Sequence, residues 1–475
     1  MPSRELLKWA PVVLLCVTQG CAALSTNLTI PEKKLPETFE VKSAAPSVAQ
    51  VSWRTWFEDP RLTELIGEAL GGNPDLAMAL QRVEVARAGV KQATGALFPR
   101  LDLSVGAGVR KFGLYTMDGA GNATTDITPG QLVPTHLGDF ALGLQTSWEV
   151  DLWGKLRNQR QAVVSTYLAS VEGTHLVTTS LVAEVATAWF ELQALDRVHE
   201  VLVETATRQA EALEVVRLQK SAGRASELAV QQFEAQLADT RALEVGVAQQ
   251  RVETENRLNF LLGRAPQPID RKTTLAFEAL PAISAGLPSE LLRYRPDVRE
   301  AELQVQASQF DLKSAQAAFF PNINLSAGVG LQAFNPAYLF RLPESLFYSL
   351  LGGLVAPLVN RSAIEANFDG AKASQLQAMY NYQKVVLNAF VEVATGLSNI
   401  QNTEKILALR KEQKEAVEKS VETADILYRA GKASYLEVLA AQQTALRADL
   451  ELIETWRRQR VASVAIYRAL GGGWQ

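Results

Sequence analysis

The residues that could do chemistry are few in this chain of 475 residues. It holds three histidines and two cysteines, and both cysteines, Cys16 and Cys21, lie near its beginning. A transition-metal centre needs several such ligands around one point, so the sequence predicts no metal site and no cofactor. Arg295 and Asp297 form a conspicuous charged pair, but no nucleophile and base accompany them. We therefore expect no catalytic site and a structural role for this pair.

The charge balance excludes one class of partner. The chain carries 47 basic and 51 acidic residues, for a net charge of -4. Binding to nucleic acid requires a strongly basic face that neutralises phosphates. Nucleic acid is therefore not expected as a partner.

The first residues are typical of an export signal. A short basic start precedes an apolar run over 9–17 that is too short to span a bilayer, and small residues follow up to Gly20-Cys21. We expect 1–20 to be a signal peptide, Cys21 to be the lipidated residue, and 21–55 to be a lipid-anchored tether. The alternative is an ordinary signal peptide in which the cysteine is incidental.

The rest of the chain repeats itself. Residues 73–109 align without gaps on 295–331, and the turn sequence at 222–226 returns at 430–434. Repeats of this size indicate one structural unit used twice. The sequence thus predicts a first repeat over 56–263, an equatorial linker over 264–290, a second repeat over 291–471 and a short tail over 472–475.

Each repeat follows one plan, which is a helix, a β-hairpin and a long helical hairpin. The spacing predicts a helix over 62–97, after which apolar residues alternate with small or polar ones. The expected hairpins lie within 101–150 and 322–357. Long helices follow over 155–221 and 362–430, and each ends near a glycine. After the glycine a second helix runs back, to about residue 262 in the first repeat and to about 470 in the second.

The strand pattern has consequences for assembly. Strands of about ten residues with one apolar face suit a tilted bilayer crossing. Four strands cannot close on themselves, and an open edge in lipid costs several kcal/mol for each unpaired group. Two copies give eight strands with a filled interior, whereas three give twelve and leave a lumen. The alternative is a soluble four-stranded sheet packed on the helices.

Several motifs resemble those of the TolC-like outer membrane factor family, and within it the NodT-type lipoproteins of efflux pumps. The most specific blocks are Trp148 to Lys155 (WEVDLWGK) and Gly286 to Arg299 (GLPSELLRYRPDVR). The resemblance runs from about residue 50 to near the end of the chain.

The resemblance implies a mixed α/β membrane protein with long α-helical hairpins and four β-strands per protomer. In this family a homotrimer forms a twelve-stranded β-barrel in the outer membrane, continuous with a periplasmic α-helical barrel. The implied function is the passive exit duct of a tripartite pump that exports small molecules such as drugs and toxic compounds. The implied partners are a periplasmic adaptor protein, an inner-membrane transporter of the RND type and outer membrane lipid.

The resemblance also implies where this duct is gated and docked. In the family, carboxylates that follow the turn of the second helical hairpin ring the periplasmic constriction and favour cations. Glu437 falls on one such position, with Asp425 and Tyr435 as further gate candidates. The expected adaptor contacts are the turn residues Gly223, Arg224, Gly431 and Lys432.

Two other functions stay open from the sequence. One is an outer membrane duct for type I protein secretion, which has the same general shape. The other is a structural periplasmic coiled-coil lipoprotein, which would conduct no ions.

Overall fold

The structure is a computed structural model. It describes residues 26–31, 33, 36, 51–271, 277, 288, 291–357, 359 and 361–474. The expected signal peptide, Cys21 and most of the tether lie outside the described residues.

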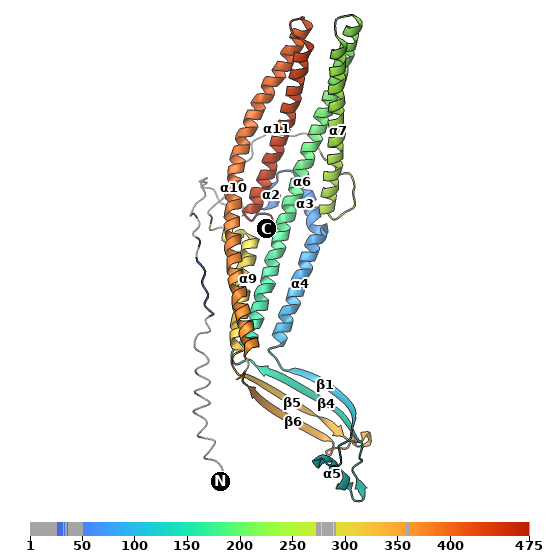
Figure 1. The fold of residues 1–475 in the computed structure, drawn as a ribbon, viewed down its shortest axis with the longest axis vertical. Coiled ribbons are helices and arrows are strands. Elements are labelled where there is room, and N and C mark those ends of the chain that lie inside the picture. Colours follow the sequence, from blue (N-terminus) through green and yellow to red (C-terminus); the bar gives the residue numbers. More distant parts are fainter. Residues whose placement is uncertain are drawn as a thin grey trace. The chain divides into compact units, whose positions relative to one another are not determined.

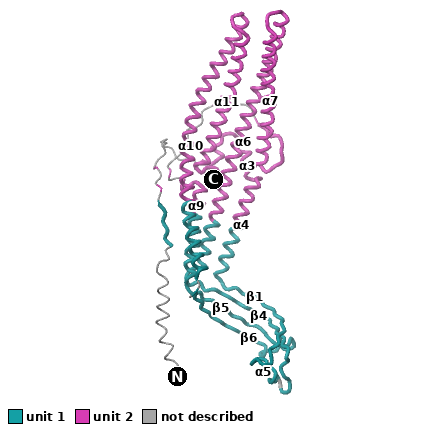
Figure 2. The backbone as a smooth tube through the Cα atoms, viewed as in Figure 1, with its two compact units in different colours: residues 1–31, 85–167, 303–380 teal, residues 32–84, 168–302, 381–475 magenta. Residues whose placement is uncertain are grey.

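The chain divides into two compact units (Figure 2). The first consists of residues 1–31, 85–167 and 303–380, and the second of residues 32–84, 168–302 and 381–475. Each unit takes residues from both predicted repeats. The division into signal peptide, tether, repeats and linker stays a prediction.

Helices make up most of the described chain, and the longest are α6 with 67 residues and α10 with 68 (Figure 1). The helices are α2 (Trp53–Trp56), α3 (Pro60–Gly72), α4 (Pro74–Gly95), α5 (Met117–Thr124), α6 (Lys155–Ser221), α7 (Glu227–Leu261), α8 (Leu291–Tyr294), α9 (Pro296–Ala317), α10 (Ser362–Arg429) and α11 (Tyr435–Ala469), with a short 3₁₀ turn η4 (Pro336–Tyr338). No helix in the described part of the chain has a stretch both long and apolar enough to cross a bilayer.

The helix expected over 62–97 is in fact two helices. The chain breaks at Asn73, whose φ of -70° and ψ of 125° are extended. A proline follows at position 74, and the residue before a proline is pushed out of the helical region. The Asn73 side chain then caps the next helix by accepting the N–H groups of Asp75 at 2.9 Å and Leu76 at 3.0 Å. The proline therefore starts a second helix rather than lying inside one.

The first unit contains a four-stranded antiparallel sheet in the order β1 (Arg100–Arg110), β4 (Leu137–Val150), β5 (Asn322–Ala333) and β6 (Leu346–Val355). The two hairpins, far apart in sequence, pair through β4 and β5, with Trp148 opposite Leu325. The polar stretch between β1 and β4 contains α5 and a small ribbon of β2 (Asp126–Thr128) and β3 (Gln131–Leu132).

The outer strands of this sheet expose apolar side chains. On β1 and β6 these are Leu101, Leu103, Val105, Val109, Leu346, Tyr348, Leu350, Leu351, Leu354 and Val355. The β5–β6 pairing, with Ser326 opposite Leu351, fixes the register of β6, which is apolar on both faces. An apolar surface of this extent is typical of a protein–protein or lipid contact.

The second unit holds the main apolar core. It gathers side chains from short N-terminal helices, from α6 and α7, and from α10 and α11. Fully buried members include Trp189, Tyr467, Leu62, Leu65, Ile66, Leu192, Leu258, Ile466 and Leu470. Trp56 stacks on Tyr467 with ring centroids 5.2 Å apart, so α2 is packed against α11.

One contact in this core occurs twice. Gly263 after α7 has φ +72°, and a Cβ there would lie 2.0 Å from the carbonyl oxygen of Gly72. Gly471 after α11 has φ +93°, and a Cβ there would lie 2.5 Å from the carbonyl oxygen of Tyr294. Each long helical hairpin therefore ends in a glycine pressed against the backbone that precedes a proline-started helix.

Candidate functional site

The two helical hairpins of the second unit turn in the same way. Gly223 and Gly431 both have φ +69°, a conformation that favours glycine. The N–H of Gly223 donates to the Lys220 carbonyl at 2.9 Å, and that of Gly431 donates to the Tyr428 carbonyl at 2.9 Å. These bonds satisfy helix-end carbonyls, so the glycines are explained by helix capping alone.

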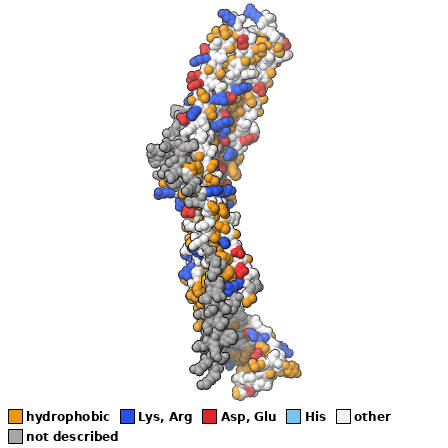
Figure 3. Space-filling view, turned by 60° about the vertical axis from the view of Figure 1, so that its left-hand side comes forward, with side chains coloured by type: hydrophobic (Ala, Val, Ile, Leu, Met, Phe, Trp, Pro, Cys, Tyr) orange, Lys and Arg blue, Asp and Glu red, His pale blue; other side chains and the backbone are white. Residues whose placement is uncertain are grey.

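The residue after each glycine is basic and exposed. Arg224 and Lys432 follow the two glycines, and neither has an ion-pair partner among the described residues. Basic side chains are visible at the helical tips (Figure 3). The tips therefore offer unpaired positive charge to another molecule.

Glu437 lies in the first turn of α11, and its carboxylate is held by the backbone. The N–H of Ser434 donates to this carboxylate at 2.6 Å. That bond, with the Ser434 hydroxyl, holds the pKa of the Glu437 carboxyl below its usual range. The helix N-terminus also favours an anion there. Glu437 is thus an exposed, fixed negative charge, but at this position the same geometry is also an ordinary capping box.

The other two gate candidates make different contacts. Asp425 pairs with Arg429 one turn later on α10 at 2.9 Å. Tyr435 is half-buried and packs on the small core shared by α6, α7 and α11. The structure therefore brings Tyr435 and Glu437 to the same helix start, and leaves the Asp425 carboxylate engaged on its own helix.

One contact that was not predicted from the sequence joins the two hairpins. The Tyr428 hydroxyl donates to the Gln219 side-chain oxygen at 2.5 Å, across α10 and α6. The sequence spacing could have indicated this contact, because Gln219 precedes Gly223 by four residues and Tyr428 precedes Gly431 by three. Antiparallel hairpins of equal height place such residues at the same level.

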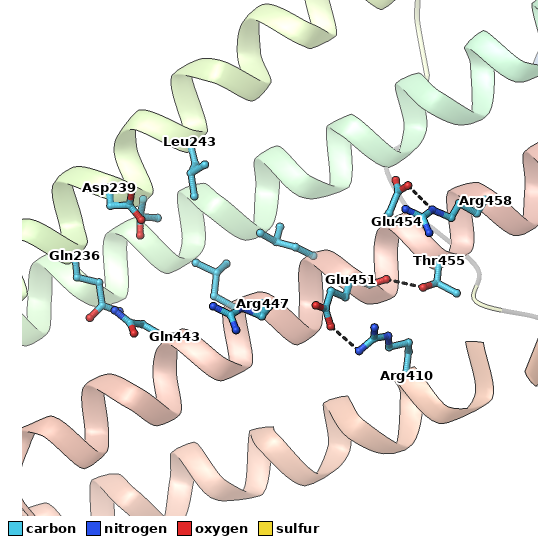
Figure 4. A pocket seen from close by; sticks show the side chains of 13 residues that line it. Gln236, Asp239, Leu243, Arg410, Gln443, Arg447, Glu451, Glu454, Thr455 and Arg458 are labelled. Atoms are coloured by element: carbon cyan, nitrogen blue, oxygen red, sulfur yellow. Dashed lines mark hydrogen bonds and ion pairs between the residues drawn. The ribbon is translucent and has the colours of Figure 1, made fainter. Parts of the chain in front are cut away.

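Below the tips a cleft of about 670 Å³ lies between α7 and α11, with α10 at its side (Figure 4). Arg410 from α10 pairs with Glu451 of α11 at 2.5 Å across one edge. Gln236 and Gln443 point toward one another from α7 and α11. The cleft is polar at its ends and carries leucines in its wall: Leu243, Leu446 and Leu450.

The charged pair singled out from the sequence is structural. The Arg295 guanidinium, only 6% exposed as a residue, donates to Asp297 at 2.9 and 2.6 Å, to Glu392 at 2.8 Å and to the Ala469 carbonyl at 2.7 Å. Burial acts to lower the pKa of Arg295, but the two carboxylates more than offset it and raise the pKa. This arginine ties α9 to α10 and to the end of α11.

Other conspicuous polar residues also cap or tie helices. Asp59 caps α3 through the N–H of Arg61 at 2.9 Å and accepts the Trp189 indole N–H at 2.9 Å. Asp151 accepts the N–H groups of Leu156 and Arg157 at the start of α6. Within the described ranges, no group of three or more His, Cys, Asp or Glu side chains could hold a metal ion.

Residues 65–264 and 287–472 match the model of a protein family described as outer membrane efflux protein. The chain belongs to this outer membrane efflux protein family. The match covers both hairpin tips, the four-stranded sheet and the Arg295 tie. It also accounts for the small number of residues suited to catalysis, since these proteins are passive channels and not enzymes.

Curated relatives of the efflux family align over nearly the whole chain. The cation efflux system protein CusC of Escherichia coli is 29% identical over 475 residues, covering 98% of this chain and 99% of CusC. The pyoverdine export outer membrane protein OpmQ of Pseudomonas aeruginosa is 31% identical, covering 91% and 89%. The solvent efflux pump outer membrane protein SrpC of Pseudomonas putida is 31% identical, covering 89% and 87%.

Solved structures agree with this assignment. A structure of CusC matches with a TM-score of 0.81 at 27% identity, covering 94% of this chain and 99% of that one. The open state of the outer membrane channel MtrE of Neisseria gonorrhoeae matches with a TM-score of 0.82 at 25% identity, covering 94% and 98%. The fold class predicted from the sequence, with long helical hairpins and four strands per protomer of a trimeric channel, is therefore confirmed. So are the efflux function and the outer membrane location.

Proposed function

We propose that this member of the family is the exit duct of a tripartite pump, gated at the helical tips of the second unit. The observation that carries the gate is the Tyr428–Gln219 hydrogen bond, which ties the ends of the two hairpins together. The Glu437 carboxylate, held by the Ser434 N–H, lies in the first turn of α11. A tie between hairpins keeps the tip shut, and fixed carboxylates around the opening favour cations over anions.

The assembled duct is a homotrimer. β1 and β6 each lack a second neighbour within the described sheet, and an unpaired strand edge recruits another strand. Their exposed leucines and valines also need a cover. Three copies joined edge to edge give twelve strands, enough to surround an aqueous path.

The tips also carry the expected contact with the periplasmic adaptor. Gly223 and Gly431 make both turns tight, and Arg224 and Lys432 present unpaired positive charge beside them. The adaptor in turn joins the duct to an inner-membrane transporter of the RND type. Charge reversal by Arg224→Glu with Lys432→Glu should reduce co-purification of a periplasmic adaptor protein that is co-expressed with the duct. The exposed Lys419→Glu on α10 is the matched control and should leave co-purification unchanged.

The N-terminus anchors the duct through lipid at Cys21. The relative SilC is named a probable outer membrane lipoprotein, which supports this proposal. Intact-mass measurement should find the added acyl mass in the wild type and in Cys16→Ala, and none in Cys21→Ala. An unmodified mass for the wild type would remove the anchor from the proposal.

Small molecules are the proposed cargo. The named relatives serve a cation efflux system, pyoverdine export and solvent efflux, so the family spans unlike chemistries on one fold. If the duct exports small molecules, its expression should raise the tolerance of a host strain to drugs or solvents. If it is instead a type I secretion duct, its expression should restore export of a protein substrate.

The experiment that tests the gate separates charge from capping. Glu437→Gln keeps an acceptor for the Ser434 N–H and removes the charge, because glutamine also completes a capping box. In planar bilayers this variant should lose several-fold of the cation preference with little change in thermal stability. Glu415→Gln, at an exposed position on α10, is the control and should behave as wild type. Unchanged cation preference in Glu437→Gln would count against the gate role.

A further inference from the structure

The core near the helical tips contains polar side chains where apolar ones are expected. This small core is built from α6, α7 and α11, and its buried members are Ala206, Leu213, Val216, Ala229, Val230, Phe233, Leu237 and Leu439. Gln209 lies between Ala206 and Leu213, and Gln236 lies beside Leu237. With Gln442 on α11, these glutamines form what we call the glutamine layer.

Buried amide atoms of this layer lack hydrogen-bond partners among the described residues. Gln209 is 3% exposed and Gln236 is 8% exposed, and for each both the Nε2 and the Oε1 atom are buried without a partner in the described chain. The Oε1 atoms of Gln442 and of the nearby Gln232 are also buried without a hydrogen-bond partner. A buried amide without a partner keeps its full desolvation cost.

The layer lies at one height below the tips. Gln209 precedes Gly223 by fourteen residues and Gln236 follows it by thirteen, so an antiparallel hairpin places them opposite one another. Gln442 follows Gly431 by eleven residues on the second hairpin. Six of the nine side-chain atoms that are buried without a partner in the described residues belong to Gln209, Gln232, Gln236 and Gln442. The cost is thus concentrated in one slice of the helical packing.

Water can reach this slice from one side. Gln236 forms part of the wall of the cleft between α7 and α11, where it points toward Gln443 (Figure 4). If α7 and α11 separate slightly, water enters from the cleft and supplies the missing hydrogen bonds. An apolar core has no such gain on opening, because its side chains only lose contacts.

We infer that the glutamine layer is the point at which the helical packing below the tips opens most readily, and that its unmet hydrogen bonds set how easily the duct gate opens. The second half of this inference rests on the proposed gate. The layer acts through the packing of α11, the helix that carries Tyr435 and Glu437, without itself touching cargo, so its glutamines are positioning residues.

Hydrogen exchange measured by mass spectrometry on the full-length protein in lipid nanodiscs tests the first half. Methionine matches the unbranched length of glutamine and needs no hydrogen bond, so Gln209→Met with Gln236→Met removes the cost without a cavity. Amides in 206–216 and 229–240 should then exchange about tenfold more slowly than in the wild type. Gln231→Met, at an exposed position on α7, is the matched control and should change nothing. The single variant Gln209→Met should show a smaller slowing in the same peptides.

Exchange that is unchanged or faster in both methionine variants would overturn the inference, because it would show that the amides are satisfied in the native protein. Channel recordings on the same variants test the link to the gate. We expect openings to become several-fold rarer. Slower exchange with unaltered channel openings would support the glutamine layer as the site of easiest opening and refute its role in gating. Failure of Glu437→Gln to alter the cation preference would refute only the proposed gate.

Discussion

Two glycines of the first helical hairpin provide a matched test of backbone packing. Gly263 and Gly223 have nearly the same backbone conformation, with φ +72° and +69°. At Gly223 a Cβ would meet nothing within 4 Å, whereas at Gly263 it would lie 2.0 Å from the Gly72 carbonyl oxygen and 2.7 Å from its carbon. Alanine therefore imposes the same backbone strain at both positions. Only at Gly263 would its Cβ also collide with the Gly72 carbonyl group.

The expected energies differ accordingly. An alanine in the left-handed region costs about 1–2 kcal/mol, which is the whole penalty at Gly223. At Gly263 the backbone before α4 must also move, and forcing extra volume into a packed core adds about 1–3 kcal/mol. Gly263→Ala should thus lose about 2–5 kcal/mol in all.

The assay is hydrogen exchange at the peptides around each position, combined with the thermal midpoint of the detergent-solubilised protein. Gly263→Ala should accelerate exchange at the end of α7 and the start of α4 and lower the midpoint. Gly223→Ala should accelerate exchange only at its own turn. Equal effects of the two variants at their own positions would refute the reasoning, because the close approach to Gly72 would then contribute nothing.

Three further outcomes follow from other contacts. The hydrogen bond from Ser434 lowers the pKa of the Glu437 carboxyl. The ionised carboxylate therefore stabilises the start of α11 at any pH above the ordinary glutamate pKa of about 4.3, and this stabilisation is lost as the pH falls through the lowered pKa. Exchange protection at the start of α11, corrected for intrinsic rates, should fall over that acidic range, and a flat profile would contradict the capping. Tyr428→Phe removes the bond to Gln219 and should make channel openings about two- to tenfold more frequent in bilayer recordings; unaltered openings would show that the tie does not hold the gate. Arg295→Met leaves the half-buried carboxylates of Asp297 and Glu392 without their partner and should cost about 1–3 kcal/mol, measured as a lower thermal midpoint. An unchanged midpoint would show that these contacts add nothing to stability.

The sequence was most informative where chemistry is local. The glycines at 223 and 431 predicted the two turns because only glycine takes a positive φ without strain. Alternation of apolar and small residues predicted the strands now seen as β1, β4 and β5. The same pattern reasoning failed at Asn73, where the extended residue before Pro74 divides one expected helix into two.

The tertiary structure decided what depends on distant residues meeting. Periodicity gave no register for β6, since both its faces are apolar, and only pairing with β5 fixed it. No local pattern indicates that Tyr428 reaches Gln219, or that Arg295 reaches Glu392 and the Ala469 carbonyl. The amides of Gln209 and Gln236 look in sequence like any helix-surface glutamines, and only the packing of three helices buries them. Backbone conformation is set within a few residues, so sequence alone determined it here, whereas burial and pairing depend on which helices and strands pack together in space.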